Sequence, residues 1–488
     1  MQRKVALFLM MLIFAASIRQ SSHLSLVRAQ EDDDPYGADW FGEGIMYEVF
    51  VRSFRDSDGD GVGDLRGVIE GLDYIQGLGA NIIWLMPIHP TTTYHGYDVT
   101  DYYGINPDYG TMEDLQALIA EVHRRDMYII MDYIANHTSN AHPFFIDSFG
   151  NPESEYSDFY MWTNEEQTEY RSFANARYLP RINYDSAQAR EYMINVATYW
   201  LDPNGDGDTS DGFDGLRCDV ATGPPFDFWE ELRASMLLVN PDAVLLAEAW
   251  LRNGLELKTF VESGTAFNAI FDFPTYHTAA GDHDVNGDGI FSGAISGDFL
   301  ELPINGAQRL YPVGAHLVRF ANNHDTNRVM SEVEGDLARA KAVAVWLLTL
   351  PGTPMIYYGE EIGMFGSKGT GPRVYDEFRR EPFDWYASED GEGMTTWFRT
   401  GDRYNAPFDG ISVEEEDLEP DSLLNHYRAL GALHRTIPAF YRDEGVGKVE
   451  LSEEGIDLYA IYRGNPEEGL YYIVINFGTS PVTATFIA

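Results

Sequence analysis

Cysteine and lysine are both scarce in this chain of 488 residues. With Cys218 as its only cysteine, the chain cannot form an internal disulfide, so stability must come from packing and from bound ions. Lysine occurs only at positions 4, 258, 341, 368 and 448, and 33 basic residues face 78 acidic ones, which gives a formal net charge of −45. Such a charge repels nucleic acids and anionic membranes. We therefore expect neither as a partner, and a neutral or cationic ligand instead.

The apolar segment near the N-terminus is short for a membrane span. Val5–Ala16 has 12 residues, whereas a spanning helix needs about 20. Arg3 and Lys4 precede it, and the small side chain of Ala29 suits cleavage by a signal peptidase. The pattern predicts a signal peptide over residues 1–29 and a secreted protein, extracellular or periplasmic, that has left the membrane. An uncleaved membrane anchor is the alternative.

Apolar runs typical of strands alternate with amphipathic stretches along most of the chain. A hydrophobic content of 44% and an aromatic content of 14% indicate a globular protein with a large core and more than one domain. The predicted strands are Ile45–Phe54, Asn81–Ile88, Tyr128–Ile134, Leu216–Ala221, Val244–Trp250, Ala266–Phe273, Leu317–Ala321 and Pro354–Tyr358. The predicted helices are Leu65–Leu78, Met112–Arg125, Ala187–Leu201, Phe226–Val239, Leu337–Leu350 and Ser422–Arg435. This alternation predicts an α/β fold, a (β/α)8 TIM barrel whose active site lies where the C-terminal ends of the strands meet their loops.

Two segments interrupt the alternation. Residues 138–186 are polar and aromatic with weak periodicity and are too long for an ordinary loop, which predicts a small inserted domain after the third strand. Residues 441–488 alternate in the manner of strands and predict a short C-terminal β-domain. The strands expected there are Leu458–Tyr462, Leu470–Phe477 and Val482–Ile487. The catalytic barrel would then comprise residues 40–137 and 187–440.

Three acidic residues interrupt or follow the predicted strands. Arg217 and Asp219 lie two residues apart, so on a strand they face the same side, and the arginine would keep the aspartate ionised. Glu248 interrupts the fifth predicted strand, and Asp325 follows the seventh. An ionised carboxylate at a strand end suits the nucleophile of a covalent glycosyl transfer. One Arg–Asp pair alone is equally typical of a structural ion pair, but three such acids indicate an active site.

Four segments around these acids form a recognisable set. They are Asp132–His137, Gly215–Ala221, Ala247–Trp250 and Asn322–Asp325. From about Trp40 to its end the chain resembles glycoside hydrolase family 13, the α-amylase family. Within it, Gly352–Met364 and Arg380–Trp385 are similar to secreted bacterial α-amylases intermediate between amylases and oligo-1,6-glucosidases. The resemblance implies that Asp219 is the nucleophile, Glu248 the general acid/base and Asp325 the acid that stabilises the distorted sugar. The residues it implies for holding the sugar at the cleavage point are Tyr97, Asp98, His137, Arg217 and His324.

The same resemblance implies a secreted retaining hydrolase that cleaves internal α-1,4-glucosidic bonds of starch and maltooligosaccharides through a covalent glycosyl-enzyme intermediate. In such a mechanism the two catalytic carboxyl groups lie about 5–5.5 Å apart. The partner would be an α-glucan polysaccharide or oligosaccharide, and we expect a monomer. An oligo-1,6-glucosidase or α-glucosidase and a cyclomaltodextrin-degrading enzyme would use the same three acids, so both remain alternatives. A non-catalytic carbohydrate-binding protein on the same barrel is the remote alternative, because it is expected to lack these acids.

The acidic loop after the first predicted strand resembles a calcium-binding loop of this family. Residues 56–64 place oxygen-bearing side chains at alternate positions, which suits Ca²⁺. The ligands implied by the resemblance are the side chains of Asp56, Asp58, Asp60 and Asp64 and the carbonyl of Val62. Residues 202–208 and 284–288 have similar spacing, but Asp, Asn and Gly clusters are also typical of ordinary turns.

One segment departs from the family pattern. Leu179-Pro180-Arg181 has a base where the family has an acid after the Leu-Pro pair. Many α-amylases hold a calcium ion between the barrel and the insert, to which Asn136 would contribute here. The substitution puts that ion in doubt, and we expect Arg181 to form a salt bridge instead.

Overall fold

Eight parallel strands close into a barrel in chain order, with β8 paired to β1. The computed structural model describes residues 35–370, 375–399, 401, 403–442, 445–450, 458–478 and 480–485, so the predicted signal peptide lies outside the described residues. The barrel strands are β1 (Met46–Val49), β2 (Ile82–Leu85), β3 (Tyr128–Ile134), β4 (Gly215–Asp219), β5 (Val244–Ala247), β6 (Ala269–Phe271), β7 (His316–Phe320) and β8 (Thr353–Tyr357). The predicted (β/α)8 fold is confirmed.

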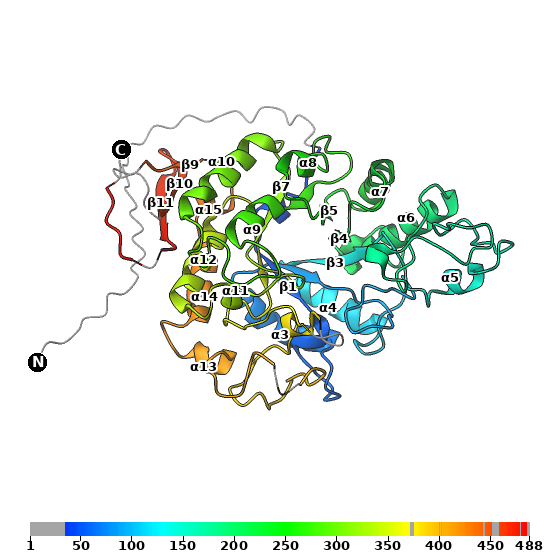
Figure 1. Ribbon diagram of the computed structural model, residues 1–488, viewed down its shortest axis with the longest axis horizontal. Coiled ribbons are helices and arrows are strands. Elements are labelled where there is room, and N and C mark those ends of the chain that lie inside the picture. The colour runs from blue at the N-terminus through cyan, green and yellow to red at the C-terminus, as the bar shows by residue number, and fades with distance from the viewer. Residues whose placement is uncertain are drawn as a thin grey trace, which may run out of the picture.

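Helices surround the barrel (Figure 1). All six predicted helices are present, with ends within one residue of the expected positions. These are α3 (Leu65–Gly77), α4 (Met112–Arg124), α6 (Ala187–Leu201), α7 (Phe226–Val239), α12 (Leu337–Thr349) and α14 (Leu423–Thr436). Side-chain caps fix the starts of all of these except α7: for example, Asp64 accepts from the N–H of Gly67 at the start of α3, and Thr111 and Asp114 form a capping box at the start of α4. The shorter helices are α1 (Asp39–Gly42), α2 (Val51–Phe54), α5 (Pro143–Ser148), α8 (Gly254–Lys258), α9 (Phe273–Ala279), α10 (Glu301–Leu310), α11 (Val329–Glu332), α13 (Val413–Asp417) and α15 (Pro438–Tyr441).

The structure divides or shortens several predicted strands. The run Ile45–Phe54 contains β1 and then the short helix α2. An apolar run of this length suits a strand or a buried helix equally well, so periodicity alone does not divide it. The ends of β5 and β6 also fall inside the predicted runs. As a result Glu248 comes directly after β5, at the mouth of the barrel, rather than within the strand.

Two further parts flank the barrel on opposite sides in Figure 1. Residues 138–186, between β3 and α6, contain α5, a 3₁₀ turn and isolated β-bridges, and they project at the right of the view. At the left lies an antiparallel sheet in the order β11-β10-β9. Its strands are β9 (Val446–Lys448), β10 (Leu458–Asn465) and β11 (Gly469–Asn476). Strand β9 has no counterpart in the prediction, and residues 482–485, the described part of the last predicted strand, have no regular structure.

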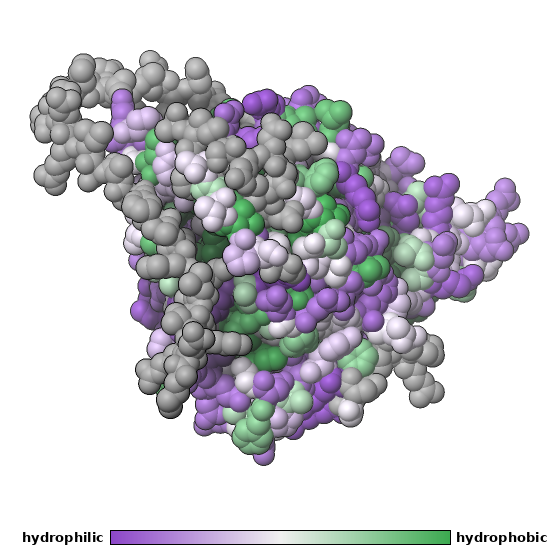
Figure 2. Space-filling model, turned by 60° about the vertical axis from the view of Figure 1, so that its left-hand side comes forward, coloured by the Kyte–Doolittle hydropathy of each residue, from purple (hydrophilic) through white to green (hydrophobic). Residues whose placement is uncertain are grey.

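The core lies in and around the barrel. Apart from Tyr128, every residue of the eight barrel strands is buried, which is typical of parallel strands covered by helices. Trp84, Trp200, Trp229 and Trp346 are among the largest fully buried side chains. On the face shown in Figure 2, hydrophilic side chains cover much of the described surface. No helix in the described ranges combines the length and the apolar character that a membrane span needs.

Candidate active site

The three predicted catalytic acids meet in one cavity. Asp219 ends β4, Glu248 follows β5 and Asp325 lies in the loop after β7, so the cavity, of about 420 Å³, is at the C-terminal end of the barrel. Tyr97 and His137, two of the predicted sugar-binding residues, also line it. The other lining residues are His95, Phe173, Tyr178, Leu179, Val220, Thr222, Trp250, Asp376 and Arg380. The fold therefore brings together acids that are far apart in the sequence.

The guanidinium group of Arg217 connects the acids. The register of β3 and β4 places Arg217 opposite Asp132, and its Nη1 donates to Asp132 Oδ1 at 2.7 Å and to Asp219 Oδ1 at 2.9 Å. Its Nη2 lies 3.7 Å from Glu248 Oε2. The Arg217 side chain is 1% exposed and is not among the residues that line the cavity. It is therefore placed to orient the acids, and the sugar contact expected for it is not supported by this position.

Glu248 is placed to carry a proton at neutral pH. Burial and the negative charge of Asp219 raise the pKa of Glu248 to about 8, although the positive charge of Arg217 opposes both effects. The N–H of Val220 donates to Glu248 Oε2 at 2.7 Å. Val220 has a backbone φ of 46°, a left-handed conformation that costs a β-branched residue on the order of 1–3 kcal/mol. The strained turn after β4 thus supplies a hydrogen bond that orients this carboxyl group.

Asp325 is held by two consecutive arginines. Arg380 Nη2 donates to Asp325 Oδ1 at 2.7 Å, and Arg379 Nη1 donates to the carbonyl oxygen of Asp325 at 2.8 Å. Burial alone would raise the pKa of Asp325, but the charge and hydrogen bond of His324, together with the charge of Arg380, lower it below its ordinary value. Asp325 is therefore ionised at neutral pH, whereas Glu248 is protonated, although both line the same cavity.

His324 is fully buried beside this carboxylate and does not line the cavity. Its Nδ1 lies 2.5 Å from Glu48 Oε1, and its Nε2 lies 2.6 Å from the hydroxyl of Tyr97 and 3.3 Å from Asp325 Oδ2. The Tyr97 hydroxyl also donates to Asp132 Oδ2 at 3.0 Å. Burial lowers the pKa of His324, but the charges of Asp325 and Glu48 raise it to about 9. Tyr97 and His324 are both predicted sugar-binding residues, but only Tyr97 lines the cavity.

His137 and Asp98 occupy different positions relative to the cavity. His137 lines it, with its ring stacked on Phe173 at a centroid distance of 5.1 Å. Burial lowers the pKa of His137, so its ring is neutral at pH 7. Asp98 is fully buried outside the cavity, where the hydroxyls of Thr91, Thr92 and Thr93 donate to its carboxylate. A direct sugar contact by Asp98, expected from the resemblance, is therefore not supported by the geometry.

Sequence reasoning assigned no role to several residues that support the site. Glu48 in β1 and Asp132 in β3 are buried acids within apolar strands, which is the signal that identified Glu248. That signal could have found both. Arg379 and Arg380 lie in and after a 3₁₀ turn beyond β8, and only the folded chain brings them to Asp325.

Comparison with known proteins agrees with this geometry. The family model "Alpha amylase, catalytic domain" matches residues 48–443. The chain belongs to the α-amylase family, glycoside hydrolase family 13. It is 36% identical over 417 residues to "Alpha-amylase 3" of Dictyoglomus thermophilum, with 81% of this chain and 77% of that protein covered. It is 31% identical over 407 residues to a "4-alpha-glucanotransferase" of Thermotoga maritima, with coverages of 78% and 85%. The crystal structure of an α-amylase from H. orenii superposes with a TM-score of 0.75 at 36% identity, covering 88% of each chain.

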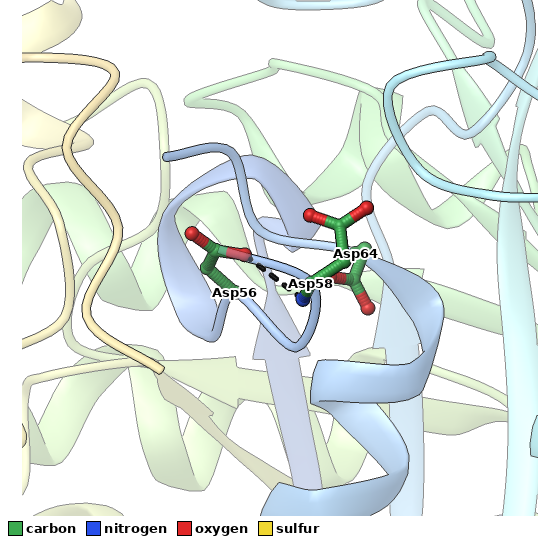
Figure 3. Close-up of side chains that lie close together, drawn as sticks. All are labelled: Asp56, Asp58 and Asp64. Carbon is green, nitrogen blue, oxygen red and sulfur yellow. Dashed lines mark hydrogen bonds between the residues drawn. The ribbon is translucent and has the colours of Figure 1, made fainter. Parts of the chain in front are cut away.

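The loop that resembles the family's calcium site gathers three of its four predicted acids. Asp56, Asp58 and Asp64 each offer a carboxylate oxygen, and these oxygens lie within 4.8 Å of one another (Figure 3). The turn needs glycine, because Gly59 and Gly61 have φ of 84° and 97°. Close carboxylate oxygens of this kind suit a hard cation such as Ca²⁺. In the described part of the chain, no other group of three metal-ligating side chains comes this close together.

The other predicted calcium ligands and loops differ from this cluster. Asp60 lies outside it, and its Oδ1 accepts from the N–H of Val62 at 2.8 Å. In the loop 202–208, Gly205 and Gly207 donate their N–H groups to Asp202 as Gly59 and Gly61 do to Asp56, but the acids of this loop form no group of three close ligands. In the loop 284–288, Asp284 forms ion pairs with Lys368 and Arg379, so cations of the protein already occupy its oxygens.

Arg181 lies between the barrel and residues 138–186. Its Nη2 donates to the carbonyl oxygen of Gly223 at 3.1 Å, and its backbone bridges to His137. The ion pairs found among the described residues do not include Arg181, so the expected salt bridge is not observed. A guanidinium group at this junction disfavours a calcium ion beside Asn136, which adjoins both Gly223 and His137.

Proposed function

We propose that this protein hydrolyses internal α-1,4-glucosidic bonds of starch and maltooligosaccharides with retention of the anomeric configuration. The observation that carries the proposal is the pairing of Asp219 and Glu248: both line one cavity, both lie next to Arg217, and Glu248 has a pKa of about 8. A carboxyl group that holds a proton at neutral pH, beside a second carboxyl group, is what acid-assisted nucleophilic cleavage needs. Membership in glycoside hydrolase family 13 supports this reaction class.

The reaction consists of two displacements. In the first, a carboxylate oxygen of Asp219 forms a bond to the anomeric carbon while the glycosidic bond breaks, and the proton of Glu248 passes to the departing oxygen. In the second, Glu248 removes a proton from water, whose oxygen attacks the anomeric carbon and releases Asp219. Arg217, held by Asp132, donates a hydrogen bond to Asp219 Oδ1 and orients that carboxyl group.

The remaining lining residues position the sugar. Ionised Asp325, anchored by Arg380, accepts hydrogen bonds from sugar hydroxyls and favours the distorted, positively charged transition state. Tyr97 and neutral His137 line the same cavity, and their rings offer surface against which a sugar can lie. Trp250 and Tyr178 supply aromatic surface on which sugar rings can pack.

The test is an assay of the purified protein on starch, maltose, isomaltose and pullulan, with product lengths and anomeric configuration followed by chromatography and proton NMR. We expect a ladder of maltooligosaccharides from starch, released in the α configuration. Glucose released only from isomaltose would instead support an oligo-1,6-glucosidase. Because one relative is named a glucanotransferase, the assay also includes maltotriose alone: products longer than the substrate would indicate transfer to sugar acceptors. A β-configured first product would contradict the retaining mechanism.

We also propose that the protein binds Ca²⁺ and is secreted. Asp56, Asp58 and Asp64 would hold the ion, which would tie the loop after α2 to the start of α3. The ion would contribute stability to this loop and no step of the reaction. The charged and apolar pattern of residues 1–29 supports export, and the N-terminal sequence of the exported protein would identify the cleavage site.

A further inference from the structure

His324 lies between two acids that come from opposite ends of the barrel sequence. Glu48 is in β1 and Asp325 in the loop after β7, and the side chains of Glu48 and His324 are both 0% exposed. Nδ1 of His324 lies 2.5 Å from Glu48 Oε1, and Nε2 lies 3.3 Å from Asp325 Oδ2. Oε2 of Glu48 has no hydrogen-bond partner in the described residues. His324 is thus the cationic partner of a buried acid that nothing in the proposed reaction uses.

The donors and acceptors around the ring determine its protonation. A pKa of about 9 keeps the His324 ring protonated at neutral pH, so Nδ1 carries a hydrogen and donates it to Glu48 Oε1. The Tyr97 hydroxyl has one hydrogen, which it donates to Asp132 Oδ2, and its oxygen therefore accepts from Nε2 of His324. Both ring nitrogens then carry hydrogen, and the ring is an imidazolium cation.

We propose that Glu48 is a positioning residue that keeps His324 as an imidazolium cation and thereby keeps Asp325 ionised and oriented in the cavity. Glu48 does not line the cavity, so it acts only through His324. The catalytic consequence rests on the proposed hydrolysis of α-glucans, whereas the protonation of His324 can be measured without any substrate.

Charges from several elements surround the ring. The charged or titratable groups that face His324 are Glu48 on β1, Tyr97 after β2, Asp132 on β3, Asp325 on its own loop and Arg380 after β8, whose Nε donates to the His324 carbonyl. Burial lowers the pKa of His324, and Asp325 and Glu48 together raise it to about 9. A neighbouring opposite charge raises the pKa of such a group by about 1–3 pH units. Without the charge of Glu48, the ring would therefore lose its proton within the working pH range, and Asp325 would lose the cation beside it.

The experiment is a pH titration of the histidine ring signals by NMR, with the ring carbons labelled. The His324 signal is assigned by its loss in His324→Asn. Glu48→Gln keeps the size of the side chain and one accepting oxygen but removes the charge, and Glu48→Asp keeps the charge. Glu361→Gln is the matched control, because Glu361 is also fully buried but accepts from the hydroxyls of Tyr47 and Tyr74.

We expect His324 to titrate above pH 8 in the wild-type protein and in Glu361→Gln, and at least about one pH unit lower in Glu48→Gln. Glu48→Asp should restore part of the difference. In parallel, the alkaline limb of kcat/KM on maltooligosaccharides should move to lower pH in Glu48→Gln, mainly through kcat. A wild-type His324 that titrates below pH 7, or one that Glu48→Gln leaves unchanged, would overturn the proposal. If Glu48→Gln does not fold, the wild-type titration alone decides. If the NMR result holds and no glucan is cleaved, the proposed function fails and the role of Glu48 as partner of His324 stands.

Discussion

Replacement of Asp219 by asparagine should abolish turnover and leave the fold intact. The change removes one negative charge at nearly constant volume. Arg217 keeps its 2.7 Å bond to Asp132, so no buried cation is left unpaired. We therefore expect the free energy of unfolding to fall by at most about 1–3 kcal/mol, the cost of one poorly satisfied buried polar group. Turnover should fall by at least about 10²-fold, because the nucleophile is lost.

The Asp219→Asn variant should also change the pKa of Glu248. The charge of Asp219 contributes to the raised pKa of Glu248, so Asp219→Asn should lower that pKa below about 8. The assay measures kcat on a maltooligosaccharide and sugar binding by calorimetry. The protonation of Glu248 in Asp219→Asn is followed by its carboxyl infrared bands, which are identified by the difference between the spectra of Asp219→Asn and Asp219→Asn/Glu248→Gln. Asp214→Asn is the matched control, since Asp214 precedes the other end of β4 and bonds to His123. More than about a hundredth of wild-type turnover in Asp219→Asn would refute the reasoning.

Three further predictions concern pH, calcium and salt. Because Glu248 must be protonated to donate and its pKa is about 8, kcat/KM should fall as the pH rises through about 8; an alkaline limb centred below pH 6 would contradict this assignment. If Asp56, Asp58 and Asp64 bind Ca²⁺, a chelator should lower the melting temperature, and Asp58→Asn should remove most of that response while Asp60→Asn should change it little. With a net charge of −45, the melting temperature should rise as sodium chloride increases from about 0.01 to 1 M, where the Debye length falls from about 30 to 3 Å, and KM for the uncharged substrate should hardly change. A melting temperature that falls steadily with salt would mean that specific ion pairs dominate.

The sequence by itself determined the fold class and the identity of the three cavity acids. Eight apolar runs alternate with six amphipathic stretches. Both patterns are local, so they can be identified in the sequence without knowing the tertiary contacts. Acids inside or just after buried strands are costly unless they are paired or functional, and for that reason Asp219, Glu248 and Asp325 are visible in the sequence alone. The apolar pattern does not mark element ends, and the structure divides one predicted strand into β1 and α2.

Only the tertiary structure decided which side chains reach the cavity. Barrel closure brings Glu48 from β1 to His324 after β7, a contact between residues 276 positions apart that no local pattern encodes. Hydroxyl donors from Thr91, Thr92 and Thr93 hold Asp98 outside the cavity, and packing places Arg181 against the Gly223 carbonyl instead of an acid. The distances between side chains and the burial that sets their pKa values depend on strand register and loop closure. These distances and this burial therefore exist only in the folded chain.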